Sequence, residues 1–441
     1  MARLWLFASG GAEHGPVRRI RNATAVQGRP YIEGAYGRAS GYGGNPPEKT
    51  TVGSGYFAHK ESVAGFTSVS EALTGHVETL GEDWIFWCGR VVVSSMGGDP
   101  GTDTYVFARC TDDMVGGGGD DDYLGVGFAC NSQTTFKFIA MRFDGLGVFE
   151  TSFANTITDN GIGGPFTMGS TVYFWVLGYD PGNNNCQLWI TPAGGSELTN
   201  AVAGTISNCQ TAAPVLKDNR YVAGTKSDQG SVVYNDCLAS CEGSADTDRP
   251  TDAMRQILYQ PNADVVSGWA SGTYCDVDDE NDTSVGDGDT DSNVITPGAA
   301  NQYQIFGFPD LVSEPTKTAT VEAVLLIWEQ QLNGSPGSYT GHTPKARLTG
   351  EAYESVTTYG SGAQGEPTTL EMWFARFLRK SPEGTPAIWT PTKFNALEWG
   401  LYSADTKPVG ELYAIVLGNY VARPTANTCA VGEARSQGLV I

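Results

Sequence analysis

Short apolar runs separated by turn residues make up the chain from about residue 50 to 245. Each run is rich in β-branched and aromatic residues, and no amphipathic helical pattern extends beyond two turns. The strands predicted in this half are residues 84–88, 91–93, 104–108, 124–128, 135–140, 172–177 and 187–190. Turn sequences such as residues 180–183 separate the runs at the spacing of an antiparallel sandwich. This half therefore predicts a β-sandwich.

The pattern changes after residue 245. Residues 246–252 are polar, and residues 253–259 predict a short helix that ends before Pro261. Strands are predicted beyond it at residues 303–308, 319–328, 369–378, 397–403 and 411–417. Neither half repeats the other at a fixed period, so the sequence does not support a solenoid or a propeller. A second all-β domain fits this half best.

The predicted fold class is all-β, with two antiparallel β-sandwich (jelly-roll) domains behind an extended N-terminal arm. The chain of 441 residues is longer than one hydrophobic core usually fills. Its 57 glycines are nearly twice the usual share of ~7%, as a fold with many tight turns requires. We place the basic arm at residues 1–48, the first sandwich at 49–246 and the second at 247–441.

The charge of the chain is strongly negative. The formal net charge is −22, so the field of the protein repels phosphates and predicts no binding of nucleic acid. Residues 1–40 are the exception, with six arginines against two glutamates. This arm either folds back onto its own acidic body or docks onto an acidic neighbour in an assembly.

Membrane insertion and export are not predicted. No apolar run approaches the ~20 residues that span a bilayer. The run at residues 4–8 is shorter than the apolar core of about 7–15 residues in a secretory signal. The nine cysteines form an odd set without a C-x-x-C pair, and we interpret most of them as buried thiols in place of a disulfide framework.

The residues that usually carry catalysis are sparse. The four histidines are isolated from one another, the G-x-S-x-G pattern is absent, and no glycine-rich segment has the order of a phosphate-binding loop. The spacing Glu-x-Asp-x-x-Glu, which would place paired carboxylates on one face of a strand, is also absent. We therefore predict a protein that is not an enzyme and has no cofactor. An extracellular polysaccharide hydrolase on a concanavalin-like fold stays an alternative without a named pair of residues.

One acidic segment is a candidate Ca²⁺ site. Asp287, Asp289 and Asp291 alternate like the first ligands of an EF-hand loop, whose oxygens converge on the ion. The sixth position of that loop is Ser292 in place of glycine, and the twelfth is Gly298 in place of glutamate. A solvated acidic loop is the alternative interpretation.

Aromatic residues offer a second route to function, because sugar rings stack on the faces of tryptophan and tyrosine while polar groups bond their hydroxyls. The sequence holds 10 tryptophans and 19 tyrosines. Trp84, Trp87, Trp175 and Trp189 lie inside strand patterns, so we predict that these four are core residues.

Two groups of residues resemble tailed-bacteriophage virion proteins. Residues 1–5 look like the start of such proteins, which continue into a laminin-G/concanavalin-like domain. Residues 170–176 and 184–190 resemble the paired strands of these lectin-like jelly rolls, although residues 191–195 replace the usual Asp-Gly. In the second half, residues 287–295, then 310–311, then 321–324, and then 386–390 with 394–400 resemble an ordered series in phage structural proteins. Within it, residues 389–390 predict a capped turn, and Phe394 with Leu397 a buried face.

The resemblance implies an accessory structural protein of a phage virion, assembled in the host cytoplasm. Its partners would be other virion proteins and copies of itself, and no catalytic residue of the family is matched. A lectin-like domain favours a tail-associated fibre or adhesin that binds host surface glycan. A capsid decoration protein is the alternative within the class, while a secreted bacterial adhesin would need an export signal.

Overall fold

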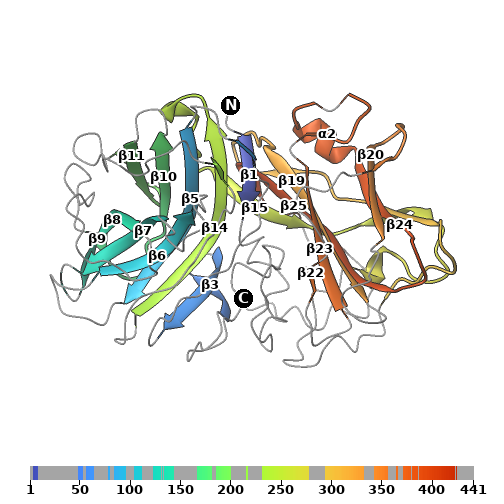
Figure 1. The fold of residues 1–441 in the computed structure, drawn as a ribbon, viewed down its shortest axis with the longest axis horizontal. Helices are drawn as coiled ribbons and strands as arrows, with labels where there is room; N and C mark the ends of the chain where they lie inside the picture. The colour runs from blue at the N-terminus through green and yellow to red at the C-terminus, as the bar shows by residue number, and fades with distance from the viewer. Residues whose placement is uncertain are drawn as a thin grey trace. The chain divides into compact units, whose positions relative to one another are not determined.

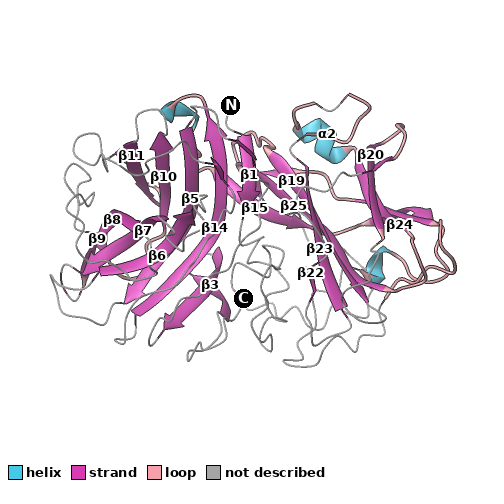
Figure 2. Ribbon diagram, viewed as in Figure 1, coloured by secondary structure: helices cyan, strands magenta, loops and turns pink. Residues whose placement is uncertain are grey.

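The computed structural model describes about half of the chain. The described residues are 3–7, 48–52, 56–63, 78–79, 84–95, 104–111, 123–130, 132, 134–143, 166–180, 185–199, 215–216, 231–277, 294–331, 342–355, 364–365, 371–378, 380–385, 387–422 and 424. Nearly all regular structure among them is β-strand, and every strand pair is antiparallel (Figure 2). The predicted all-β fold class is confirmed.

The chain divides into two compact units, Met1–Asp252 and Ala253–Ile441. The division falls six residues after the expected start of the second domain at residue 247. The 3₁₀-helix η2 (Asp246–Asp248) and the residue that follows it lie in the first unit, where Arg249 forms an ion pair with Glu197. This contact explains why the polar segment near residue 250 belongs to the first unit.

The first unit contains an eight-stranded sheet (Figure 1). Its order is β12-β11-β10-β5-β14-β3-β2, and β1 pairs with β14 beside this path. The strands are β1 (Arg3–Phe7), β2 (Glu48–Val52), β3 (Tyr56–Val63), β5 (Trp84–Ser95), β10 (Tyr173–Asp180), β11 (Asn185–Pro192), β12 (Leu198–Thr199) and β14 (Ser231–Gly243). The first residues of the expected arm are thus a strand of this sheet, and residues 8–47 lie outside the described residues.

A four-stranded sheet, β6-β7-β8-β9, faces part of the larger sheet. Its strands are β6 (Thr104–Thr111), β7 (Tyr123–Cys130), β8 (Thr135–Phe143) and β9 (Phe166–Thr167), and β4 (Glu78–Thr79) pairs separately with β13 (Val215–Leu216). Phe136 and Phe138 of β8 pack against Tyr173 of β10 with ring centroids 5.7 and 5.4 Å apart. These edge-to-face contacts join the two sheets across an aromatic core.

The tryptophans of the first unit mostly lie where the sequence predicts. Trp87, Trp175 and Trp189 are 2%, 0% and 4% exposed, so the prediction that they are core residues is confirmed. Trp84 is half-buried at the start of β5 and stacks on Phe86. Every residue of β10 is buried, as expected of a continuous apolar run that is covered on both faces.

The second unit is built from two five-stranded sheets. One has the order β15-β25-β19-β23-β22 and the other β16-β17-β24-β20-β21. The strands of the first are β15 (Met254–Tyr259), β19 (Ala323–Gln331), β22 (Gln364–Gly365), β23 (Glu371–Leu378) and β25 (Val409–Asn419). Those of the second are β16 (Ala263–Ser267), β17 (Tyr303–Gly307), β20 (Thr343–Leu348), β21 (Glu354–Ser355) and β24 (Leu397–Tyr402). A short pair of β18 (Val312–Ser313) and β26 (Val421–Ala422) and the 3₁₀-helix η3 (Tyr274–Asp276) complete the unit.

One hydrophobic core lies between these two sheets. Leu326 and Trp328 of β19 belong to the same buried cluster as Trp399 and Leu401 of β24, and the Trp328 and Trp399 rings are 6.3 Å apart. The short helix α2 (Pro391–Asn395) adds Phe394, 1% exposed, and Leu397 follows it at 2%. The buried face predicted for these two residues is confirmed.

The prediction of a helix at residues 253–259 is wrong. Met254–Tyr259 forms strand β15, and all six of its residues pair with β25 from Asn419 to Ala414. Gln256 and Ile257 are 2% and 5% exposed, so consecutive residues on opposite faces of the strand are both buried. Pairing with the long apolar strand β25 overrides the weak helix propensity of this segment.

Candidate functional site

The outer face of the second sheet of the second unit carries a group of tyrosines and charged residues, which we call the tyrosine face: Tyr303, Lys345, Arg347, Tyr353, Glu398 and Tyr402. The alternation along the strands places them there. In β20, Ala346 and Leu348 are buried, so Lys345 and Arg347, which alternate with them along the strand, point outward. In β24, Trp399 and Leu401 enter the core in the same way.

Three tyrosine rings form a continuous aromatic surface on this face. Tyr303 begins β17 and Tyr402 ends β24, and the two residues are direct partners with ring centroids 4.6 Å apart. Tyr353, from the turn before β21, stacks on Tyr303 at 5.5 Å with 27° between the ring planes. All three side chains are half-buried, so each ring is fixed by its neighbours and still partly open to solvent.

Charged groups border the rings on both sides. The Arg347 guanidinium lies over the Tyr353 ring at 4.0 Å from its centroid, and the Lys345 ammonium lies 5.8 Å from that of Tyr402. Arg347 Nε donates to Glu398 Oε2 at 2.6 Å, and Thr349 Oγ1 donates to Glu398 Oε1 at 3.0 Å. Glu398 is 7% exposed, and these two donors satisfy both of its oxygens.

The Tyr353 hydroxyl is buried within the tyrosine face. Among the described residues it has no hydrogen-bond partner. Burial raises the pKa of Tyr353, while the nearby Arg347 charge lowers it. The phenol is therefore neutral over the physiological range, and its ring serves as a surface.

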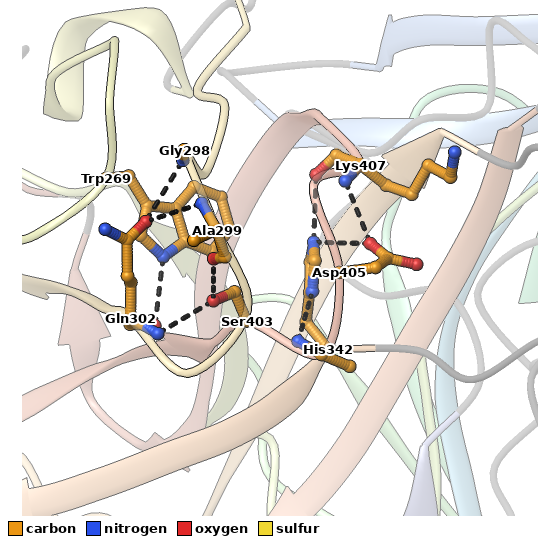
Figure 3. A network of polar contacts seen from close by, with 9 residues as sticks. Trp269, Gly298, Ala299, Gln302, His342, Ser403, Asp405 and Lys407 are labelled. Carbon is orange, nitrogen blue, oxygen red and sulfur yellow. Dashed lines mark hydrogen bonds and ion pairs between the residues drawn. The ribbon is translucent and has the colours of Figure 1, made fainter.

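A polar network at the ends of β17 and β24 fixes the Tyr303–Tyr402 pair. Tyr402 Oη donates to Asn301 Oδ1 at 3.0 Å, and the Asn301 backbone has φ 66°, a conformation that asparagine tolerates. Ser403 accepts from Gln302 N through its Oγ at 2.9 Å and donates to Ala299 O at 2.8 Å. Figure 3 shows Ser403 between Gln302 and Ala299. Gln302, which precedes Tyr303, and Ser403, which follows Tyr402, are therefore both held by hydrogen bonds.

Gln302 and Trp269 extend this network. Gln302 Oε1 accepts from the backbone N–H groups of Gly298 and Ala299, at 3.0 Å each, which closes the loop before β17. Trp269 Nε1 donates to Gln302 O at 3.2 Å (Figure 3). The tyrosine face thus rests on a loop that is closed by side chains.

A second polar cluster joins the segment after β23 to α2 and contains a serine beside a lysine, as some nucleophile sites do. Lys393 Nζ lies 3.3 Å from Ser381 Oγ, but it also forms an ion pair with Glu383. The Lys393 hydrogen bond lowers the pKa of Glu383, and Ser381 is 1% exposed and bonds to Ala387 O. Because Lys393 is ion-paired with Glu383 and Ser381 is enclosed, we interpret this cluster as a brace between the segment after β23 and α2.

The candidate Ca²⁺ ligands Asp287, Asp289 and Asp291 lie outside the described residues. In the described ranges, no group of three or more histidine, cysteine, aspartate or glutamate residues has the arrangement of a metal site. The Ca²⁺ site stays a prediction.

The structure characterises three of the cysteine side chains, those of Cys88, Cys241 and Cys275. Cys88 and Cys241 are buried thiols, as the sequence predicts for most cysteines, whereas Cys275 is disulfide-bonded. None of the helices in the described part of the chain has the length and apolar character to cross a bilayer.

Comparisons with known proteins give structural likenesses only. No family model matches the sequence, and no curated protein matches it. An alginate lyase aligns at 14% identity and TM-score 0.24, over 54% of this chain and 95% of its own. The basic winged bean lectin aligns at 13% identity and TM-score 0.23, over 42% and 87%.

The CBM2 module of an evolved Dit protein from Lactobacillus casei BL23 phage J-1 aligns at 15% identity and TM-score 0.24, over 56% of this chain and 90% of its own. At such TM-scores these likenesses carry no inference about what this chain binds. The antiparallel all-β architecture rests on the strand pairing described above, and the function has to be argued from the tyrosine face.

Proposed function

We propose that this protein is a binding protein for glycans and that the tyrosine face is its binding site. The observation that carries the proposal is the set of three contacting rings, Tyr402, Tyr303 and Tyr353, held half-exposed on the outside of a rigid sheet. Aromatic faces stack on the apolar faces of sugar rings, and neighbouring polar groups bond the hydroxyls. Lys345 and Arg347 provide donors at the border of the rings.

Within this function, we propose an accessory structural protein of a tailed-phage virion that acts as a tail-associated fibre or adhesin on host surface glycan. The resemblance of the N-terminal residues and of residues 287–295 and 386–400 to phage structural proteins supports this assignment. The acidic, charge-poor composition suits a protein packed in many copies. A capsid decoration protein is the alternative in the same particle.

The test is glycan binding by the full-length protein and by a Tyr303→Ala/Tyr402→Ala variant, on an array of bacterial surface polysaccharides. Each aromatic contact contributes about 0.5–1.5 kcal/mol beyond buried area, so losing two rings should weaken binding about tenfold or more. Titration calorimetry against the best polysaccharide measures the change. Circular dichroism must show that the variant keeps its β-structure.

Ile388→Ala is the matched control, because Ile388 is an apolar residue, 59% exposed, outside the tyrosine face. The Ile388→Ala variant should bind the polysaccharide with the affinity of the unchanged protein. If the double tyrosine variant binds with the same affinity as the unchanged protein, the tyrosine face is not the binding site. Release of reducing ends from the same polysaccharides would instead support the polysaccharide hydrolase.

A further inference from the structure

His342 lies directly before β20 and bridges the turn that follows β24. Its Nδ1 accepts from the backbone N–H of Ala404 at 3.1 Å, and its Nε2 contacts Lys407 O at 2.9 Å. A backbone N–H can only donate and a carbonyl can only accept, so this pair of bonds selects the neutral imidazole with its proton on Nε2. His342 is 2% exposed, and the Trp269 ring packs edge-on against it at 5.1 Å.

This turn is continuous with the tyrosine pair. Ala404 is two residues after Tyr402, and Thr343, the neighbour of His342, is the direct partner of Tyr402 in the sheet. Figure 3 shows His342 on one side of Ser403 and the Gln302 network on the other. The end of β24 is therefore fixed from two sides, by Gln302 and by His342.

Protonation of His342 would break this arrangement. A proton on Nδ1 would set two donors against each other, Nδ1–H and the Ala404 N–H, 3.1 Å apart. Removing that clash would require the turn or the ring to move, and Ser403, which lies between this turn and Tyr402, would carry the displacement to Tyr402. The Tyr402 bond to Asn301 Oδ1 would then no longer be aligned.

The groups that face the ring act in opposite directions. Burial lowers the pKa of His342, while the Lys407 carbonyl and Asp405, whose Oδ1 is 4.0 Å from Nε2, raise it. Figure 3 shows the Lys407 ammonium pointing away from the ring. Asp405 and Lys407 are the charged residues around the imidazole in the described part of the chain, and Trp269 covers another side.

We infer that His342 is a positioning residue of the tyrosine face, whose neutral form holds Tyr402 and Tyr303 in the geometry that binds glycan, so that binding weakens in acid. This inference rests on the proposed function and adds its regulation. His342 touches no ligand in this scheme, and it acts through residues 403–407 and Tyr402.

The sign of the accompanying stability change follows from linkage. The pKa of His342 in the folded protein lies below its ordinary value of 6.5. Between the two values the unfolded chain binds a proton that the folded chain excludes, so stability falls as the pH falls through this window and is recovered above it.

The first experiment needs no ligand. Full-length protein with ¹³C-labelled tyrosine rings is titrated from about pH 7.5 to pH 5, and the Tyr402 and Tyr303 signals are assigned with Tyr→Phe variants. We expect both signals to shift together in the unchanged protein and to stay constant in His342→Asn. Asparagine places an oxygen near the position of Nδ1, which keeps the acceptor for Ala404 and removes the titration.

The second experiment measures polysaccharide affinity over the same pH range, using the best polysaccharide from the array. The unchanged protein should bind about fivefold more weakly at the acid end, and His342→Asn should keep one affinity throughout. Should His342→Asn unfold, His342→Gln takes its place; it keeps a donor near Nε2 but lacks the acceptor for Ala404, so the result to read from it is the absence of a pH dependence, whatever its affinity.

The outcomes separate the two proposals. Tyrosine signals that ignore pH, or that shift equally in the variant, would overturn the role of His342. Signals that titrate as expected in a protein that binds no polysaccharide would support the positioning role and refute glycan binding.

Discussion

Gly400 lies on the outward side of β24, between Glu398 and Tyr402 of the tyrosine face. A Cβ atom at this position would come within 2.0 Å of the Gln304 carbonyl oxygen and 2.8 Å of Ile305 Cα in the paired strand β17. Both are backbone atoms of a central strand, so neither can rotate away. The close approach of β17 and β24 therefore depends on glycine.

We predict that Gly400→Ala lowers the free energy of unfolding by about 1–3 kcal/mol or more, because the strands must separate to admit the methyl group. It should also weaken glycan binding, since the shift moves Tyr303 relative to Tyr402. Urea unfolding followed by tryptophan fluorescence measures the first effect. Gly384→Ala is the control, because Gly384 is exposed and a Cβ atom there would meet no other atom within 4 Å. A stability loss at Gly384 as large as at Gly400 would refute this account.

The tyrosine face could not be predicted residue by residue. Tyr303 is one of 19 tyrosines, and Tyr353 lies in a turn, so no spacing marks them as partners. One signal exists: the sequence of residues 343–348 alternates polar and apolar, which indicates a strand with one outward polar face. Tyr303 and Tyr402 are neighbours because β17 pairs with β24. These strands are nearly 100 residues apart in the chain, and no local sequence pattern shows which distant strands pair.

At the scale of elements, α2 shows how a single side chain defines a helix start. Thr390 is exposed, has extended backbone at φ −137°, and accepts through its side chain from Lys393 N at 3.2 Å. Pro391 follows in the first helical position, where its missing N–H costs nothing. The capped turn predicted from residues 389–390 is this helix start.

Thr390→Ala should lower the free energy of unfolding by about 1 kcal/mol, since it removes the cap without changing the core. Thr390→Ser keeps the oxygen and should restore most of the loss. Thermal and chemical unfolding of the three proteins measure the difference. If the serine and alanine variants were equally unstable, the side-chain oxygen would not be the cause.

Strand positions are more predictable than strand partners. The apolar run at residues 411–417 lies inside β25, and the predicted strand 172–177 covers the first five residues of β10, because continuous burial leaves a local signature. Residues 254–259 have the local pattern of a short helix, and only their pairing with β25 makes them a strand. Short segments with mixed polar and apolar residues are decided by a distant partner, whereas long apolar runs are decided by their own composition.

At the scale of the whole molecule, the net charge of −22 limits the surfaces that the protein can approach. Phosphate-rich polymers are repelled at long range, so attraction has to come from short-range contacts such as ring stacking. A half-buried face of three tyrosines offers a small contact area, and one copy should therefore bind weakly. Useful attachment then requires many copies that engage at once.

This requirement gives the last prediction. If the protein is a tail-associated adhesin, antibody labelling of purified particles should place it at the tail tip, and particles should bind the polysaccharide about 10²–10⁴-fold more tightly than the isolated chain. Particles that carry the Tyr303→Ala/Tyr402→Ala variant should bind far more weakly than unchanged particles, because the loss of affinity at each site is compounded over all the copies that engage. If the label lies over the capsomers, and particles with the unchanged protein and with the variant bind the polysaccharide equally, the protein is a decoration protein. If the particles carry no label, both virion roles are rejected.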